Sequence, residues 1–138
     1  MAEYPSPQSK VAHQYLLKAF EVVMQLMKEG CRNRDDPGFA QRFAQLTVEM
    51  YRLEEAYTGL LRKEIEEWCE RDKRCRLLRL LDPEALDYVE TKLVAEIRDK
   101  AIELLRELFK EDDKKCRQGK QQAEEYILKS FEIYAGKK

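Results

Sequence analysis

The sequence is poor in residues that end helices and build turns. Its 138 residues include five glycines, four prolines, one asparagine, and three each of serine and threonine. Turn-rich all-β domains need many such residues between their short strands, so this shortage favours long helices. Glu, Lys, Arg, Leu and Ala, which are good helix formers, are abundant instead. A charge-rich, asparagine-poor composition is typical of hyperthermophile proteins, but an all-helical mesophile protein has it too, so both origins stay open.

Long apolar runs are also absent. No run approaches the roughly 18 residues that cross a bilayer, so we expect no membrane-spanning segment. The opening residues, MAEYPSPQSK, lack the apolar stretch of a secretion signal, which predicts a chain that is not exported. The 26 basic and 27 acidic residues give a net charge of −1. Bulk charge therefore does not indicate a nucleic-acid binder, and any affinity for phosphate must come from local clusters.

Residues that support catalysis or bind metals are scarce. His13 is the only histidine, and the sequence contains no Glu-x-x-His pair for a di-iron site and no glycine-rich phosphate loop. Neighbouring carboxylates such as Glu54 and Glu55 diverge on a helix and fit a solvated surface. We expect a protein that is not an enzyme, with no metal, no cofactor and no small-molecule substrate.

Four cysteines are present, at positions 31, 69, 75 and 116. Without a secretion signal we expect reduced thiols, although the disulfide-rich intracellular proteins of hyperthermophiles leave one bridge possible. Cys69 and Cys75 are six residues apart and would point about 240° away from each other on one helix. We expect neither a disulfide nor a shared metal between them, and interpret both as small buried hydrophobic residues.

Apolar periodicity predicts an all-α, four-helix bundle-like fold in a single helical domain spanning residues 1–138. Asp36-Pro37 and Asp82-Pro83 each have the form of a helix start, and Gly30 suits the end of the first helix. The predicted helices cover residues 8–29 (with Ser6 or Ser9 near the N-cap), 36–68 with a continuation towards Leu81, 82–108, and a last helix after a loop at 111–120. Gly59 is expected to weaken the second helix only slightly.

Both ends of the chain are expected to lie outside this bundle. Residues 1–8 form an extended N-terminal arm, and residues 135–138 form a C-terminal tail.

The first helix is unusually apolar. In residues 15–27, YLLKAFEVVMQLM, all but Lys18, Glu21 and Gln25 are apolar. A helix that is apolar nearly all round is buried nearly all round, either by the other helices of the chain or by a partner subunit. The candidate partner-interface residues are Tyr15, Leu16, Phe20, Val23, Met24 and Met27.

Basic residues gather in two places. The stretch CERDKRCRLLRLLDP (69–83) carries a ridge of basic side chains beside leucines that can turn inward, and CRNR (31–34) carries a second cluster. These side chains either contact nucleic-acid phosphates without reading sequence or pair with nearby carboxylates such as Glu67, Glu70 and Asp72. The candidate phosphate contacts are Arg32, Arg34, Arg42, Lys73, Arg76 and Arg79.

The small size, the leading AEYPSPQ, the all-helical body, the apolar YLLKAFEVVMQLM and the basic turns CRNR and CERDKRCR together resemble the small helical capsid proteins of filamentous archaeal viruses. The resemblance implies a structural virion protein that pairs with itself or with a related capsid subunit. Such dimers would stack helically around double-stranded DNA and hold it in an A-like form. The near-neutral charge departs from that family, and a more basic partner subunit would make up the difference.

Two other functions stay open. One is a helical small subunit of a ribonucleoprotein complex of the CRISPR type, and the other is a cytoplasmic helical adaptor that binds a protein partner without nucleic acid.

Overall fold

The protein is all-α in this computed structural model, which describes residues 4–136. The four-helix bundle-like prediction is confirmed in its class, but the described residues form six helices and one isolated β-bridge between Arg32 and Phe109. The helices are α1 (Pro7–Lys28), α2 (Phe39–Thr58), α3 (Leu60–Arg71), α4 (Lys73–Leu81), α5 (Ala85–Leu108) and α6 (Lys114–Ala135).

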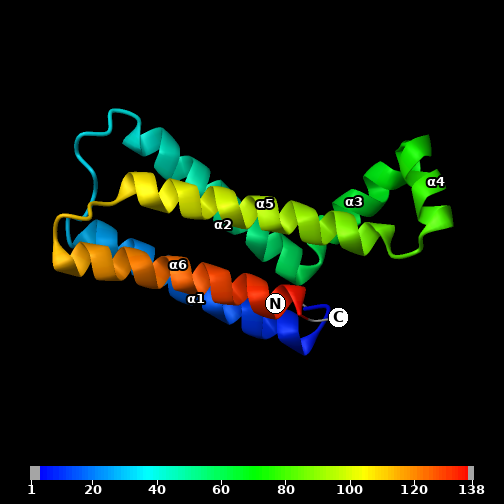
Figure 1. The fold of residues 1–138 in the computed structure, drawn as a ribbon, viewed down its shortest axis with the longest axis horizontal. Coiled ribbons are helices and arrows are strands. Elements are labelled where there is room, and N and C mark those ends of the chain that lie inside the picture. The colour runs from blue at the N-terminus through cyan, green and yellow to red at the C-terminus, as the bar shows by residue number, and fades with distance from the viewer. Residues whose placement is uncertain (1–3, 137–138) are drawn as a thin grey trace.

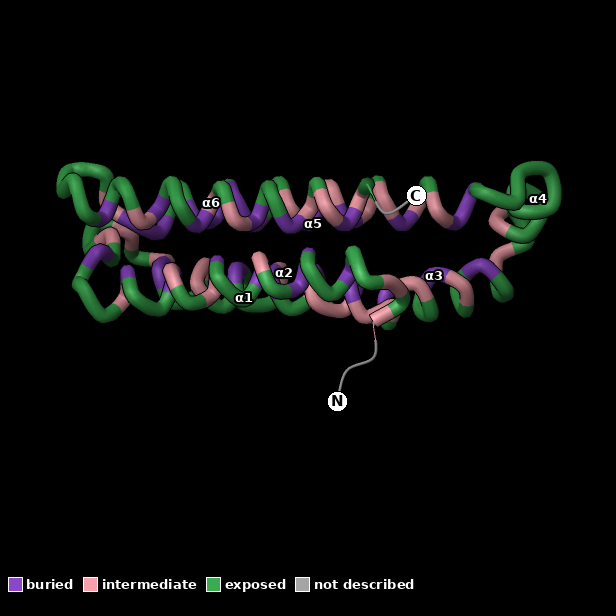
Figure 2. The backbone as a smooth tube through the Cα atoms, turned by 90° about the horizontal axis from the view of Figure 1, so that it is seen from below, coloured by how far each residue is buried: buried purple, intermediate pink, exposed green. Residues whose placement is uncertain are grey.

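Four long helices make the bundle and the rest of the chain extends it at one end. α1 packs mainly on α6, and α2 mainly on α5 (Figure 1). α3, α4 and the first turns of α5 project beyond the α1/α6 pair, as both views show (Figures 1 and 2). We call this projecting part the arm. The chain is therefore elongated, with α4 at one extreme and the α1–α2 connection at the other.

The core is a single hydrophobic cluster whose small residues let the helices approach closely. Ala12 and Ala19 of α1 and Ala123 of α6 are fully buried. A Cβ atom placed on Gly119 would lie 2.7 Å from a methyl carbon of Leu26, so only glycine permits this α1–α6 contact without a shift.

The first helix begins and ends within one residue of its predicted bounds. Ser6 is its N-cap, and the Ser6 hydroxyl accepts a hydrogen bond from the Ser9 backbone N–H at 3.1 Å. Gly30 follows the helix with a φ of 75°, which favours glycine.

The prediction of one helix over residues 36–68, with a continuation towards Leu81, was wrong, because the structure divides this stretch into α2, α3 and α4. Gly59 has a φ of 85° and ends α2, with its N–H bonded to the carbonyl of Ala56 at 3.2 Å. Asp72 is extended and separates α3 from α4.

Both Asp-Pro pairs lie just before a helix and not at its first turn. Asp36 accepts a hydrogen bond from the Gly38 N–H at 2.9 Å, and Asp82 accepts one from the Glu84 N–H at 3.0 Å. Each aspartate thus caps a short turn, and the helices start only at Phe39 and Ala85.

The last loop is shorter than predicted. α6 begins at Lys114, inside the predicted loop 111–120, because the Asp113 side chain accepts a hydrogen bond from the Lys115 N–H at 2.8 Å. The N-terminal arm is also shorter than the predicted residues 1–8, because α1 begins at Pro7. The Tyr4 ring lies against His13, with 5.3 Å between the ring centroids. Residues 1–3 of that arm and 137–138 of the tail lie outside the described part of the chain.

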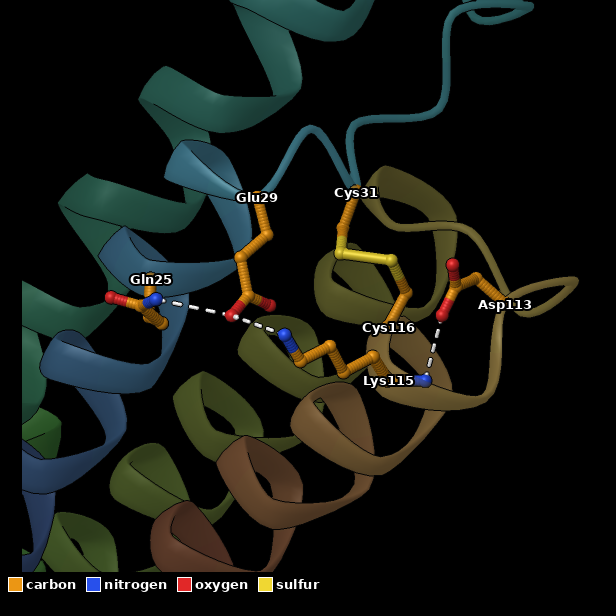
Figure 3. Close-up of a disulfide and its surroundings, with 6 residues drawn as sticks. All are labelled: Gln25, Glu29, Cys31, Asp113, Lys115 and Cys116. Atoms are coloured by element: carbon orange, nitrogen blue, oxygen red, sulfur yellow. Dashed lines mark hydrogen bonds and ion pairs between the residues drawn. A yellow bond between two sulfur atoms is a disulfide. The ribbon is translucent and has the colours of Figure 1, made fainter.

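All four cysteines are bonded, so the prediction of reduced thiols was wrong. Cys31, in the α1–α2 connection, bonds Cys116 in the first turn of α6 (Figure 3). Both residues are buried, and Lys115 pairs beside them with Glu29 at 3.8 Å. The second disulfide joins Cys69 of α3 to Cys75 of α4.

The two disulfides should differ in their effect on stability, because they close loops of different length. Cys31–Cys116 spans 85 residues, and loop-closure entropy gives it about 4–5 kcal/mol. Cys69–Cys75 spans 6 residues, for which the same relation gives about 2 kcal/mol. Urea unfolding should show Cys31→Ser/Cys116→Ser losing markedly more free energy of unfolding than Cys69→Ser/Cys75→Ser. Equal losses would contradict this assignment.

Candidate functional site

The arm ends in a short basic segment that we call the tip, residues 71–81, comprising Arg71 at the end of α3, Asp72 and α4. Asp72 turns the chain at its start: the Asp72 N–H donates to the carbonyl of Trp68 at 3.1 Å, and its side chain accepts from the Arg74 N–H at 2.9 Å. The same residue therefore closes α3 and caps α4.

The disulfide Cys69–Cys75 holds the tip against α3, contrary to the prediction that these thiols could not meet. On one continuous helix, six residues would separate the two Cα atoms by about 9 Å along the axis. The break at Asp72 brings them to 5.0 Å. The prediction failed because it assumed that the helix ran through this point.

The leucines of the tip are exposed, although the sequence analysis expected them to turn inward. No residue of α4 is buried. The exposed fractions are 61% for Leu77, 50% for Leu78, 80% for Leu80 and 84% for Leu81. Single exposed leucines are ordinary, but four on one two-turn helix form an uncovered apolar surface.

The basic side chains of the tip have no ionic partner within residues 4–136. They are Arg71, Lys73, Arg74, Arg76 and Arg79, against one acidic residue, Asp72. The carboxylates Glu67, Glu70 and Asp72, proposed as alternative partners, form no salt bridge with them. A chain of net charge −1 thus concentrates unpaired positive charge at one end.

The side chains of α4 fall on three sides of the helix, which carry a cysteine, leucines and arginines. Successive residues of a helix point about 100° apart around its axis. Measured from the direction of Cys75, the four leucines centre roughly 140° to one side, and Arg76 and Arg79 centre about 70° to the other side. Because Cys75 faces α3 through the disulfide, the leucine side points away from the arm. Lys73 and Arg74 occupy the first turn, at the N-terminal end of the leucine side.

Exposed aromatic residues flank an apolar groove at the base of the tip. The groove lies between α3 and α5, has a volume of about 480 Å³, and includes Trp68 and Tyr88 in its lining. Trp68 is 48% exposed and Tyr88 67% exposed. The tip and its base thus present leucine, arginine, tryptophan and tyrosine to the outside.

The other predicted basic cluster is at the opposite end of the molecule. The Asn33 N–H bonds the carbonyl of Leu108, the last residue of α5, whereas the tip precedes the first residue of α5. α5 has 24 residues, so about 36 Å separates the clusters. The structure does not bring the six candidate phosphate contacts together.

Side chains of this second cluster are largely engaged. Arg42 pairs with Asp36 and with Glu107 at 3.3 Å. The hydrogen bond from Arg42 lowers the pKa of Asp36, and the same bond raises the pKa of Arg42. Arg32 stacks on the Phe39 ring at 4.7 Å, and Arg34 is exposed. Of Arg32, Arg34 and Arg42, Arg34 alone has neither a salt bridge nor a ring contact among the described residues.

The chain itself covers part of the apolar first helix. Leu16 and Val23, predicted to contact a partner, are 1% and 2% exposed and belong to the core, so that prediction was wrong for these two. Tyr15, Phe20 and Met27 are half-buried. Met24, at 53%, is the one predicted partner-interface residue that is mostly exposed.

A polar network fixes the arm to the bundle. Arg62 of α3 pairs with Asp87 and, at 3.1 Å, with Glu90 of α5, and the Tyr134 hydroxyl of α6 donates to Glu90. Glu90 is 4% exposed, so its carboxylate depends on these partners. Burial opposes the charged form of Arg62, yet the bonds to Asp87 and Glu90 outweigh it and raise the pKa of Arg62.

Beside this network, Ser130 links three helices. Its hydroxyl donates to the carbonyl of Ala12 at 2.7 Å and lies 2.8 Å from the Tyr57 hydroxyl in a second hydrogen bond. Burial raises the pKa of Tyr57 to about 12, against the lowering effect of Ser130 and Arg98. Burial and the bond to Glu90 also raise the pKa of Tyr134.

Sequence reasoning missed these buried polar residues. Glu90 and Lys120 are both 4% exposed, and Lys120 is held by the carbonyl of Arg106 at 3.2 Å and by Glu111. Glu90 sits one residue after Val89 and four before Val94, so its position on the apolar side of α5 was a readable signal. The partners of Glu90 come from two other helices, so no signal in the sequence identified them.

Within the described residues no helix is long and apolar enough to cross a membrane, and no three His, Cys, Asp or Glu side chains gather as metal ligands. No family model, no curated protein and no solved structure matches this chain. The physical character of the tip is therefore the basis for assigning a function.

Alkaline pH should destabilise the fold through its buried tyrosines. Because folding raises the pKa of Tyr57 from 10 to about 12, the unfolded state loses its proton first, and stability present below pH 10 declines above it. Urea unfolding should show a loss of about 1 kcal/mol from Tyr57 between pH 9 and pH 11. Tyr57→Phe should reduce that decline by the same amount, and an unchanged pH profile in this variant would contradict the assignment.

Proposed function

We propose that the chain is a non-catalytic structural assembly subunit, in its most specific form a capsid protein of a filamentous virus that packs around double-stranded DNA. The supporting observation is the tip, where five basic side chains have no ionic partner among residues 4–136. Such side chains suit phosphate contacts that hold a polyanion without reading its sequence.

The charge distribution favours an array over a single binder. One chain has a net charge of −1, yet residues 71–81 carry five basic residues against one acidic residue. Each subunit would contribute a few phosphate contacts, and many subunits on one DNA would add avidity that a single chain lacks.

The length of the molecule fits this arrangement. About 36 Å separates the tip from the cluster with Arg32 and Arg34, so the two basic clusters could contact well-separated phosphates of one duplex. A subunit lying along the DNA axis could touch the backbone at both ends. The tip would be the stronger contact, because Arg42 at the other end is already paired.

The test is DNA binding by a variant of the tip, Lys73→Gln/Arg76→Gln/Arg79→Gln. With a random-sequence DNA duplex and fluorescence anisotropy at several salt concentrations, the intact chain should lose affinity steeply as salt rises. The variant should bind at least about tenfold more weakly, with a salt slope reduced by about 2–3, because each phosphate contact contributes about 0.9 to that slope.

A matched control replaces three exposed lysines outside the tip, Lys10→Gln/Lys63→Gln/Lys92→Gln, and should leave the slope nearly unchanged. Equal effects of the two variants would mean that the overall charge, and not the tip, causes the binding, and this would contradict the proposal. A preference for duplex RNA would favour the ribonucleoprotein subunit, and no binding to either nucleic acid would favour the adaptor.

A further inference from the structure

The leucine side of the tip is not explained by DNA binding. Leu77, Leu78, Leu80 and Leu81 are each at least 50% exposed. Phosphate and sugar offer charge and hydrogen bonds to a protein but no apolar surface for a strip of leucines. The basic residues and the leucines of α4 therefore require a partner with two chemistries.

The tip has the geometry of a helix that lies flat on a surface. In Figure 1, α4 runs across the far end of the arm, at a steep angle to α3 and α5. Its leucine side faces roughly opposite to the Cys75 anchor and so away from the molecule. Nothing else in the described chain projects beyond α4 at that end, so a flat surface can reach the leucines without meeting the bundle.

The positive charge of the tip favours an anionic partner over a second copy of the chain. A second copy of the chain would bring two tips together, each with five basic residues and one acidic residue, and the two would repel. An anionic bilayer attracts the same side chains and also buries leucines. Glu67 and Glu70 precede the tip and Asp82 and Glu84 follow it, but residues 71–81 themselves carry five basic residues against one acidic residue.

We infer that the tip is a membrane-surface helix for anionic lipid bilayers. The leucines insert at the boundary between headgroups and acyl chains, and the arginines and Lys73 contact lipid phosphates. Lys73 and Arg74, at the end of the leucine side, keep their charged ends at the headgroups while their aliphatic stems lie along the apolar strip. The contact lies in the plane of the bilayer and spans nothing.

Two further features support this contact. Trp68 and Tyr88, exposed at the base of the tip, are the residue types that settle at the level of lipid headgroups. A nine-residue helix is marginal in water by itself, and the disulfide Cys69–Cys75 together with the Asp72 cap keeps α4 folded before it meets a surface. The inference shares the basic residues of the tip with the proposed function but rests independently on the leucines.

Sedimentation with lipid vesicles tests the inference. The oxidised full chain should co-sediment with phosphatidylcholine vesicles that contain about 30% phosphatidylglycerol, and much less with pure phosphatidylcholine. Trp68 is the only tryptophan, so its fluorescence should shift to shorter wavelength on binding. Leu77→Gln/Leu80→Gln/Leu81→Gln should weaken vesicle binding at least tenfold and leave DNA binding unchanged.

Controls separate the leucines from general surface hydrophobicity and from charge. Leu17→Gln/Leu60→Gln/Leu128→Gln replaces leucines that are 43–49% exposed elsewhere and should bind vesicles as the intact chain does. Lys73→Gln/Arg76→Gln/Arg79→Gln should weaken binding to both anionic vesicles and DNA. Because no residue of α4 is buried, all tip variants should keep the helical circular dichroism of the intact chain.

Three results would overturn the inference. The first is DNA binding with no affinity for anionic vesicles, which leaves the proposed function intact. The second is vesicle binding that the leucine variant of the tip retains or that leaves Trp68 emission unchanged, which places the contact elsewhere. The third is a concentration-dependent dimer that the tip leucine variant loses, without vesicle binding, which assigns the leucines to a second copy.

Discussion

The arm depends on the buried carboxylate of Glu90. Removing a carboxylate from water costs several kcal/mol unless charged and hydrogen-bonding partners replace the solvent. Arg62 and Tyr134 provide those partners from α3 and α6, so Glu90 ties the arm to the bundle at one point. An α3 helix packed on α5 only through apolar side chains could slide along it. A paired carboxylate tolerates little displacement, and this fixes where the tip is carried.

The tip is stabilised differently from everything behind it. The bundle is held by buried side chains such as Leu16, Leu53 and Leu105, whereas α4 buries none. Its order comes from one covalent bond, one capping aspartate and the two helices that flank it. Such a helix contributes little apolar burial to folding, yet it carries four exposed leucines and four of the five basic residues of the tip. A surface of this kind costs solubility and is best explained by an interaction that uses it.

The sequence predicted the helical class and the bounds of the first helix, because both follow from local periodicity and from capping residues such as Ser6 and Gly30. It failed where one residue overrides a long apolar pattern. Gly59 and Asp72 each interrupt a regular stripe, and the stripe alone gave no sign that the chain would bend there. The error at Asp72 then led to two other wrong predictions. One was that Cys69 and Cys75 could not form a disulfide, and the other was that the leucines after them point inward.

Part of the candidate site was nevertheless readable. The concentration of arginine after Asp72 is visible in the sequence, and so is its contrast with the near-neutral net charge of the full chain. What could not be read was the distance between the two basic clusters, because it depends on the antiparallel return of α5 along α2. The partners of Glu90, and the covering of Leu16 and Val23 by the chain itself, likewise depend on tertiary packing and have no local signature.

The proposed roles of the tip require an ordered α4 whose leucines remain uncovered in the isolated, oxidised chain. Nuclear magnetic resonance with a soluble paramagnetic agent tests this directly, through the backbone shifts of residues 73–81 and the methyl signals of Leu77, Leu78, Leu80 and Leu81. We predict helical shifts together with strong broadening of these methyls, in contrast to the methyls of Leu16 and Leu105. Protected methyls in the tip, or shifts of an unfolded segment, would contradict the account.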